Sequence, residues 1–190
     1  MRKILLATAF AAAAFVLPAV ASAAPTVLTV DLDKVLGECT ACRAASAAIQ
    51  SQVQAGQARA QALEAQLKPE ATAIDAAARA LNGKDADAAL KKRANDFQAR
   101  QQAAQTELAN KQRAIESTQA NVQQQIAGRV VVVAEQVRVR RQADIVIGKN
   151  ATLASNPAND VTAEVLAALN SQLPSVSVTP LPQQNRPTGR

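Results

Sequence analysis

The strongest constraint on this chain is a spacing of apolar and small residues at alternating steps of four and three. The spacing begins at Ile49, stops at the polar stretch LNGKDAD, and restarts at Leu90. A 3.5-residue repeat predicts a helix that packs along one seam, and a glycine-containing polar stretch predicts a turn. Two such helices around one turn predict a long antiparallel hairpin over residues 37–141, with its turn near 82–86.

Small and polar residues occupy many positions of the predicted seam. The seam positions are Ile49, Val53, Gly56, Ala60, Leu63, Leu67, Glu70, Ile74, Ala77 and Leu81, then Leu90, Ala94, Phe97, Gln101, Ala104, Leu108, Lys111, Ile115, Thr118 and Val122. At about 25 cal/mol per Å² of buried apolar surface, an alanine stabilises a seam less than a leucine. We therefore expect flexible arms, with a kink at Pro69. A turn at Pro69 is disfavoured, because the returning arm would be about twice as long as the outgoing one.

The N-terminal 23 residues have the pattern of a secretory signal peptide. Arg2 and Lys3 precede the apolar run ILLATAFAAAAFVLPAV, and small residues end the pattern at Ala23. The run is shorter than the ~20 residues needed to span a bilayer, which disfavours a membrane anchor. We predict that residues 1–23 are a signal peptide cleaved near Ala23, and that the mature chain is exported to an oxidising compartment.

Short β-branched segments flank the hairpin and predict a small β-containing body. The segment 27–32 and the segment ADIVIG (143–148) have strand-like composition. The valine-rich stretch after Gly128 fits either a helix or a strand, and the helical stripe of Val130, Val133 and Val137 favours a helix.

A last short helix is expected after the loop NPAND, with Asp160 as its N-cap. Residues 24–36 and 142–172 are predicted to form the body, which holds too few apolar residues to close alone and should oligomerise. Residues 173–190 are rich in proline and predict a disordered tail. The fold class is therefore mostly α, with a long helical hairpin projecting from a small β-containing oligomerisation body.

Residue types that carry most enzymatic chemistry are missing from the predicted mature chain. The chain contains no histidine, tryptophan or tyrosine, and Phe97 is the only aromatic residue after the signal peptide. This composition excludes Ser-His-Asp and Cys-His catalysis, histidine-ligated metal sites and aromatic platforms for single-stranded nucleic acid. We predict a non-enzymatic protein with no catalytic residue, no metal, no cofactor and no nucleic-acid partner.

The only two cysteines, Cys39 and Cys42, form a C-x-x-C pair near a helix start. The pair lacks the βαβ context of a thioredoxin-like motif, and one pair without histidine is a poor zinc site. A local disulfide is favoured, because a helix N-terminus lowers the pKa of a thiol and promotes its oxidation. Two free buried thiols, or a redox or inter-subunit role, are the alternatives.

Two aspartates, Asp31 and Asp33, precede the first predicted helix. On a strand they would share a face and offer two carboxylates to a divalent cation. Capping of the following helix is the favoured interpretation, because carboxylates are stabilised near a helix N-terminus.

The charge of the chain is basic, at +6 overall, and the excess lies on the helices. A cluster of cations lies at and near the predicted turn: Lys84, Lys91, Lys92, Arg93 and Arg100. Such a surface favours acidic partners, either unfolded client proteins or an anionic membrane. We hypothesise that these five side chains contribute to client or membrane contact; a solvated basic surface is the alternative.

Taken in order, the segments resemble a known family. The opening VLTVDLDKVLGE, the Ala/Gln-rich hairpin and the closing ADIVIGKNATLASNPANDVTAEVLAAL are similar to the Skp/OmpH family of periplasmic chaperones, over about residues 26–170. The resemblance implies a homotrimer with a β body and three helical arms around a cavity. It also implies an ATP-independent holdase that binds unfolded outer-membrane proteins in the periplasm. The cysteines and the proline-rich tail are outside the pattern.

Two other classes of function fit the same residues. A structural coiled-coil protein of the envelope would need a better-filled seam than this chain has. A basic module that binds lipid or lipopolysaccharide is compatible with the charge.

Overall fold

The computed structural model describes residues 24–182. The predicted signal peptide lies outside the described residues, as does the end of the predicted tail from residue 183. The elements, in chain order, are β1 (Val27–Val30), α1 (Leu32–Glu38), α2 (Thr40–Ala80), α3 (Ala88–Arg140), β2 (Ile145–Gly148), the 3-10 turns η1 (Lys149–Ala151) and η2 (Pro157–Asn159), and α4 (Thr162–Gln172). The predicted fold class, mostly helical with a long hairpin and a small β region, is confirmed.

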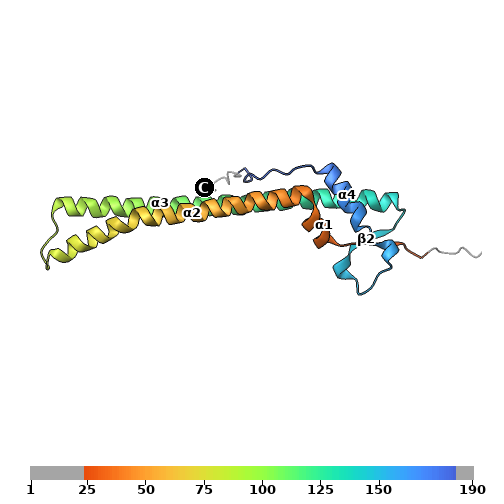
Figure 1. Ribbon diagram of the computed structural model, residues 1–190, viewed down its shortest axis with the longest axis horizontal. Coiled ribbons are helices and arrows are strands. Elements are labelled where there is room, and N and C mark those ends of the chain that lie inside the picture. The colour runs from red at the N-terminus through yellow and green to blue at the C-terminus, as the bar shows by residue number, and fades with distance from the viewer. Residues whose placement is uncertain (1–23, 183–190) are drawn as a thin grey trace, which may run out of the picture.

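The long helices α2 and α3 form the hairpin, which projects far from the rest of the chain (Figure 1). The connection between them covers residues 81–87. Gly83 has φ +84° and Asn82 has φ +48°, a left-handed conformation that glycine and asparagine adopt more readily than other residues. Asp87 then caps α3, because its Oδ1 accepts a hydrogen bond from the N–H of Leu90 at 2.7 Å. The ambiguous valine-rich stretch is helical to Arg140, as predicted.

The seam of the hairpin is thin. Between residues 46 and 117 only Leu63 and Ala104 are buried. Most other seam positions are half-buried, whereas Gln101 and Lys111 are exposed. Gly56 lies in the seam, where an added Cβ would sit 3.8 Å from the Cδ1 atom of Ile115. Two helices of this length therefore meet while burying few side chains completely.

The body closes around a parallel pair of strands from the two ends of the hairpin. Val27 pairs with Ile145 and Val30 with Gly148. Thr29 forms a further parallel bridge with Asp160 on the other edge of β1. The buried core contains Leu28 and Val30 of β1 together with residues of the four helices and their caps: Val35, Cys39, Ala41, Cys42, Ala45, Val122, Ile126, Val133, Val137, Val161, Val165 and Leu169. The base of the hairpin is therefore part of the body's core.

The start of the arm differs from the prediction. The sequence predicts one helical arm from residue 37, but a separate helix α1 spans Leu32–Glu38 and the arm begins at Thr40. The chain breaks at Cys39, whose ψ of 126° is not helical. Cys39 can leave the helix because its side chain caps α2, accepting a hydrogen bond from the N–H of Cys42 at 3.2 Å. The predicted boundary between residues 36 and 37 thus falls inside α1.

The last helix also starts one residue later than predicted. The N-cap of α4 is Val161, without a side-chain capping bond, rather than Asp160. Asp160 precedes the N-cap and still contacts the first turn of α4, because its Oδ1 accepts a hydrogen bond from the N–H of Thr162 at 2.9 Å. The backbone of Asp160 is engaged by the β-bridge to Thr29, which holds this residue in an extended conformation.

The predicted disorder of the tail is wrong for residues 174–182, which we call the strap. The strap leaves α4 and runs back along the base of the hairpin as extended chain (Figure 1). Val176 and Val178 pack against the buried core, and polar side chains of α2 and α3 bind its backbone. A proline-rich segment has no regular structure of its own, but here it takes its order from the helices beneath it.

Candidate functional site

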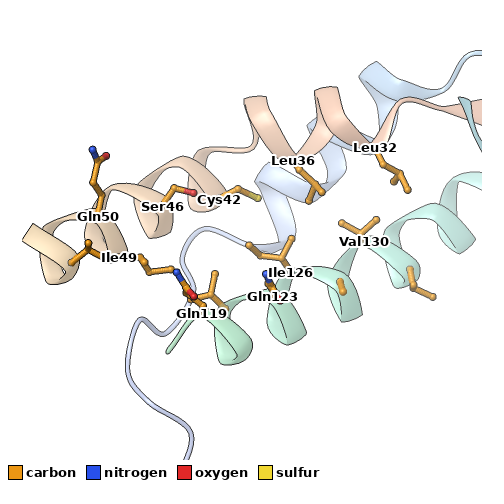
Figure 2. A pocket seen from close by; sticks show the side chains of 14 residues that line it. Leu32, Leu36, Cys42, Ser46, Ile49, Gln50, Gln119, Gln123, Ile126 and Val130 are labelled. Atoms are coloured by element: carbon orange, nitrogen blue, oxygen red, sulfur yellow. The ribbon is translucent and has the colours of Figure 1, made fainter. Parts of the chain in front are cut away.

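An open apolar groove lies where α1, α2 and α3 meet at the base of the hairpin. Its volume is about 970 Å³. Leu32 and Leu36 reach it from α1, Ile49 from α2, and Ile126 and Val130 from α3 (Figure 2). The apolar face of the short helix α1 thus continues the seam of the hairpin into the body.

The groove remains exposed in a single chain. Leu32, Leu36 and Val131 line it and are 39%, 42% and 69% exposed. Glutamines and Ser46 contribute the polar part of the lining, and neither acid nor base lines it. Such a surface is suited to binding apolar side chains. Sequence reasoning missed the groove, because it depends on where α1 lies in space relative to α2 and α3.

The two cysteines lie beside this groove. The structure pairs Cys39 and Cys42 as a disulfide, with Cα atoms 5.1 Å apart. Cys39 is fully buried, and Cys42 both belongs to the core and lines the groove. The pair joins the N-cap of α2 to its first turn, so it reinforces the break between α1 and α2.

The five cations predicted as a contact surface are distributed around the tip. Arg93 and Arg100 of α3 both reach Glu70 of α2, with nitrogen–oxygen distances of 3.5 and 2.6 Å. Lys92 pairs with Asp96 on its own helix at 2.6 Å. Three of the five cations are therefore partly neutralised by local carboxylates.

Lys84 and Lys91 differ from the other three. Neither forms an ion pair with any residue of the described range 24–182, and both are exposed. Lys84 lies in the turn and Lys91 in the first turn of α3. Unlike the charges of the other three, these two are not shared with a directly bonded carboxylate in the described part of the chain.

Glu70 is the residue that sequence reasoning placed in the seam without a role. The hydrogen bond from Arg100 holds the pKa of Glu70 below its usual range, against the raising effect of burial. Glu107 is held in the same way by Arg59, at 2.7 Å between Nε and Oε1. The position of Glu70 in the predicted seam could have indicated these ion pairs, because a charge between two helices needs a partner on the opposite helix.

Asp31 and Asp33 both lie at the N-terminus of α1. The Oδ1 atom of Asp31 accepts from the N–H of Lys34 at 2.9 Å, which makes it the N-cap of α1. Asp33 lies in the first turn of the same helix. Within residues 24–182 no group of three or more acidic or cysteine side chains is placed to hold a metal ion.

In the same range, no helix has both the length and the apolar character required to cross a bilayer.

Comparison with known proteins identifies the fold. A family model described as outer membrane protein (OmpH-like) matches residues 26–169. The chain belongs to the OmpH-like family. Among solved structures, a candidate outer membrane chaperone (OmpH-like) from Caulobacter crescentus is similar, with a TM-score of 0.70 and 24% identity. The match covers 85% of this OmpH-like chain and 95% of the other. A search of curated proteins finds no significant match.

Proposed function

We propose that this OmpH-like chain is a periplasmic holdase that binds unfolded outer-membrane proteins without ATP. The observation that carries the proposal is the hairpin itself. Over residues 46–117 its two helices bury only Leu63 and Ala104. Because so few side chains are buried between the two helices, their half-buried apolar side chains remain available for contacts with other chains.

The family membership supports the same role. The solved neighbour is described as a candidate outer membrane chaperone, and its fold is similar over 95% of its chain. A holdase needs many weak and adaptable contacts rather than one rigid site, and a thin, flexible seam supplies them. The basic N-terminus, apolar run and small residues of 1–23 support export to the periplasm.

The body supports association of several copies. The groove is open, and Val131, Val132, Val139 and Ile145 are large apolar side chains exposed on or near the body. The strand β2 pairs with β1 alone within residues 24–182, so its outer edge can receive another strand. We propose that copies of the chain cover this surface as a homotrimer, which would set three arms around one cavity.

The cations of the tip are proposed to act in the capture of clients or at an anionic membrane. Lys84 and Lys91 are the side chains best placed for this role, because the charges of the other three are shared with Glu70 and Asp96. Long-range attraction of this kind speeds encounter and weakens as salt is added.

The proposal is tested by dilution of a urea-unfolded outer-membrane β-barrel into buffer, with and without the mature protein and without nucleotide. Suppressed light scattering at about one trimer per client is the expected result, and a static light-scattering mass of the chaperone alone checks the trimer. Unchanged scattering would overturn the holdase assignment and leave a structural or lipid-binding coiled-coil protein. Binding to anionic vesicles without an effect on scattering would favour the lipid-binding function.

A further inference from the structure

The strap and the helix beneath it are in register. Between residues 177 and 181, every second residue of the strap bonds every fourth residue of α3 through its backbone. The pairs are Ser177 with Gln125, Thr179 with Asn121, and Leu181 with Ser117. We call these three α3 residues the polar ladder. Four helical residues rise about 6.0 Å and two extended residues about 6.6 Å. The two repeats therefore match closely over the length of the strap, and the chains run in opposite directions.

The polar ladder binds the strap through its backbone alone. Gln125 binds both polar groups of one residue: its Nε2 donates to the carbonyl of Ser177 at 3.0 Å, and its Oε1 accepts from the N–H of Ser177 at 2.9 Å. Asn121 donates to the carbonyl of Thr179 at 2.9 Å. An amide side chain that pairs with one residue's N–H and C=O reads no side chain, since every non-proline residue offers that pair.

The second helix and Ser117 complete the backbone contacts. Nε2 of Gln52 on α2 donates to the carbonyl of Val178 at 3.1 Å. The N–H of Leu181 donates to Oγ of Ser117 at 2.9 Å. Three consecutive carbonyls of the strap, at residues 177–179, thus accept hydrogen bonds from amide side chains on both helices of the hairpin.

The side chains of the strap alternate between the two faces of the extended chain. Val176 and Val178 pack on the core, whereas Ser177 and Thr179 are exposed and bond each other at 2.8 Å between hydroxyl oxygens. Alternation of apolar and polar residues with a period of two is the pattern of transmembrane β-strands in outer-membrane barrels. The strap has the pattern of a short piece of such a strand.

We propose that the polar ladder and Gln52 form a binding site for extended polypeptide of alternating polarity, and that the strap occupies this site in competition with unfolded clients. The competition rests on the holdase function proposed above, whereas the site itself does not. The strap is suited to bind this site weakly, so that an unfolded client can displace it. Its prolines at 174, 180 and 182 favour extended backbone, and each lacks the N–H that could donate a hydrogen bond to the helices.

The site is tested with the free peptide PSVSVTPLP, which has the sequence of residues 174–182. Fluorescence anisotropy measures its binding to the mature chain ending at residue 173, which lacks the strap, and to the control chain ending at residue 182. We expect saturable binding to the first and at least tenfold weaker binding to the second. Circular dichroism checks that both are folded. Equal binding, or none by a folded 24–173 chain, would overturn the site.

Substitutions in the peptide test how it is read. Replacement of both valines by serine should weaken binding at least tenfold, because those side chains meet the core. Replacement of Ser177 and Thr179 by alanine should change it less than about twofold, because their backbone carries the bonds. The reverse order of effects would contradict backbone recognition.

Competition is tested in the intact mature chain, which does not depend on the truncated one. Hydrogen exchange at the amides of Ser177 and Leu181 is measured with and without an unfolded barrel protein, whose binding is followed separately. Faster exchange by at least several-fold is expected when the client binds. The change Gln125→Ala should speed exchange without client, whereas Gln124→Ala, an exposed neighbour outside the ladder, should not.

The two proposals fail differently. A client that binds while these amides remain protected would overturn the competition and leave the holdase function intact. Absence of client binding would overturn the holdase function, and with it the competition, while the peptide measurement still decides whether the site exists.

Discussion

The base and the tip of the hairpin are held together by different forces. At the base, α2 and α3 contribute to a shared core with α4, and side chains such as Val133 and Val137 are fully buried. Toward the tip, no residue between 64 and 103 is buried, and the two helices are joined across the seam by Glu70 with Arg93 and Arg100. One pair of helices is therefore tightly packed where it meets the body and loosely packed toward its tip.

The largest expected difference between base and tip comes from one substitution made in both places. Ile126→Ala, in the core at the base, should lower the free energy of unfolding by about 2–4 kcal/mol, because it removes buried surface and leaves a cavity. Ile74→Ala, half-buried in the outer half of the arm, should cost about 1 kcal/mol or less. Urea unfolding measures both. Equal losses would mean that the tip contributes to the cooperative core.

A charged side chain of the body gives the second effect. Hydrogen bonds from Thr162 and then from Lys149 lower the pKa of Asp160 to about 2. A carboxylate with a depressed pKa stabilises the fold above its ordinary pKa near 4, and this stability is lost as the pH falls toward 2. Asp160→Asn should cost roughly 1–3 kcal/mol at neutral pH and flatten the loss of stability between pH 4 and 2. An unchanged acid profile would show that Asp160 does not hold the body together.

The exposed lysines of the tip should affect binding rather than stability. Lys84→Glu with Lys91→Glu should weaken client affinity about five- to tenfold at low ionic strength, and the difference should shrink as salt is added. The matched control is Arg43→Glu with Arg129→Glu, the same change of charge at exposed positions nearer the base. Equal weakening by both pairs would indicate a general effect of net charge instead of a contact at the tip.

The smallest expected effect is that of the ion pairs across the seam. Glu70→Gln removes the partner of both Arg93 and Arg100, and it should speed hydrogen exchange in the neighbouring turns of α2 while leaving the unfolding midpoint almost unchanged. Because the pKa of Glu70 is depressed, acidification below its ordinary pKa should loosen the same turns in the wild-type protein and have no further effect in the variant. A large shift of the midpoint would contradict the separation between base and tip.

The sequence predicted what depends on local pattern. The 3.5-residue spacing predicted two helices, and β-branched segments predicted strands over 27–32 and 143–148. The observed strands are the shorter Val27–Val30 and Ile145–Gly148, because Asp31 caps α1 and Leu32 begins it. The break at Cys39 was not predictable from the spacing, since it depends on a side chain capping the helix that follows. The partners of Glu70 require the register between two helices, which a single pattern does not contain.

The strap shows the limit of composition as a guide. Proline-rich sequence correctly indicates that residues 174–182 form neither helix nor strand. Composition cannot show that Gln52, Asn121 and Gln125, more than 50 positions away along the chain, supply the missing hydrogen-bond partners. The alternation of Val176, Ser177, Val178 and Thr179 was visible in the sequence and was the one available sign of an extended segment with a buried face.

The parallel pairing of β1 with β2 has a consequence for how the chain folds. Val27 and Ile145 pair although they are 118 positions apart, and contacts so distant in sequence form slowly, because the intervening chain must lose much of its freedom first. Helical turns and the contacts around residues 81–87 are local, so they can form early and bring the two strands close together. During synthesis β1 is made long before its partner and must remain unpaired until the whole hairpin has followed. The arm therefore shortens the search of β1 for β2. A substitution in the arm that delays its formation should slow folding of the body, although it alters no residue of the body.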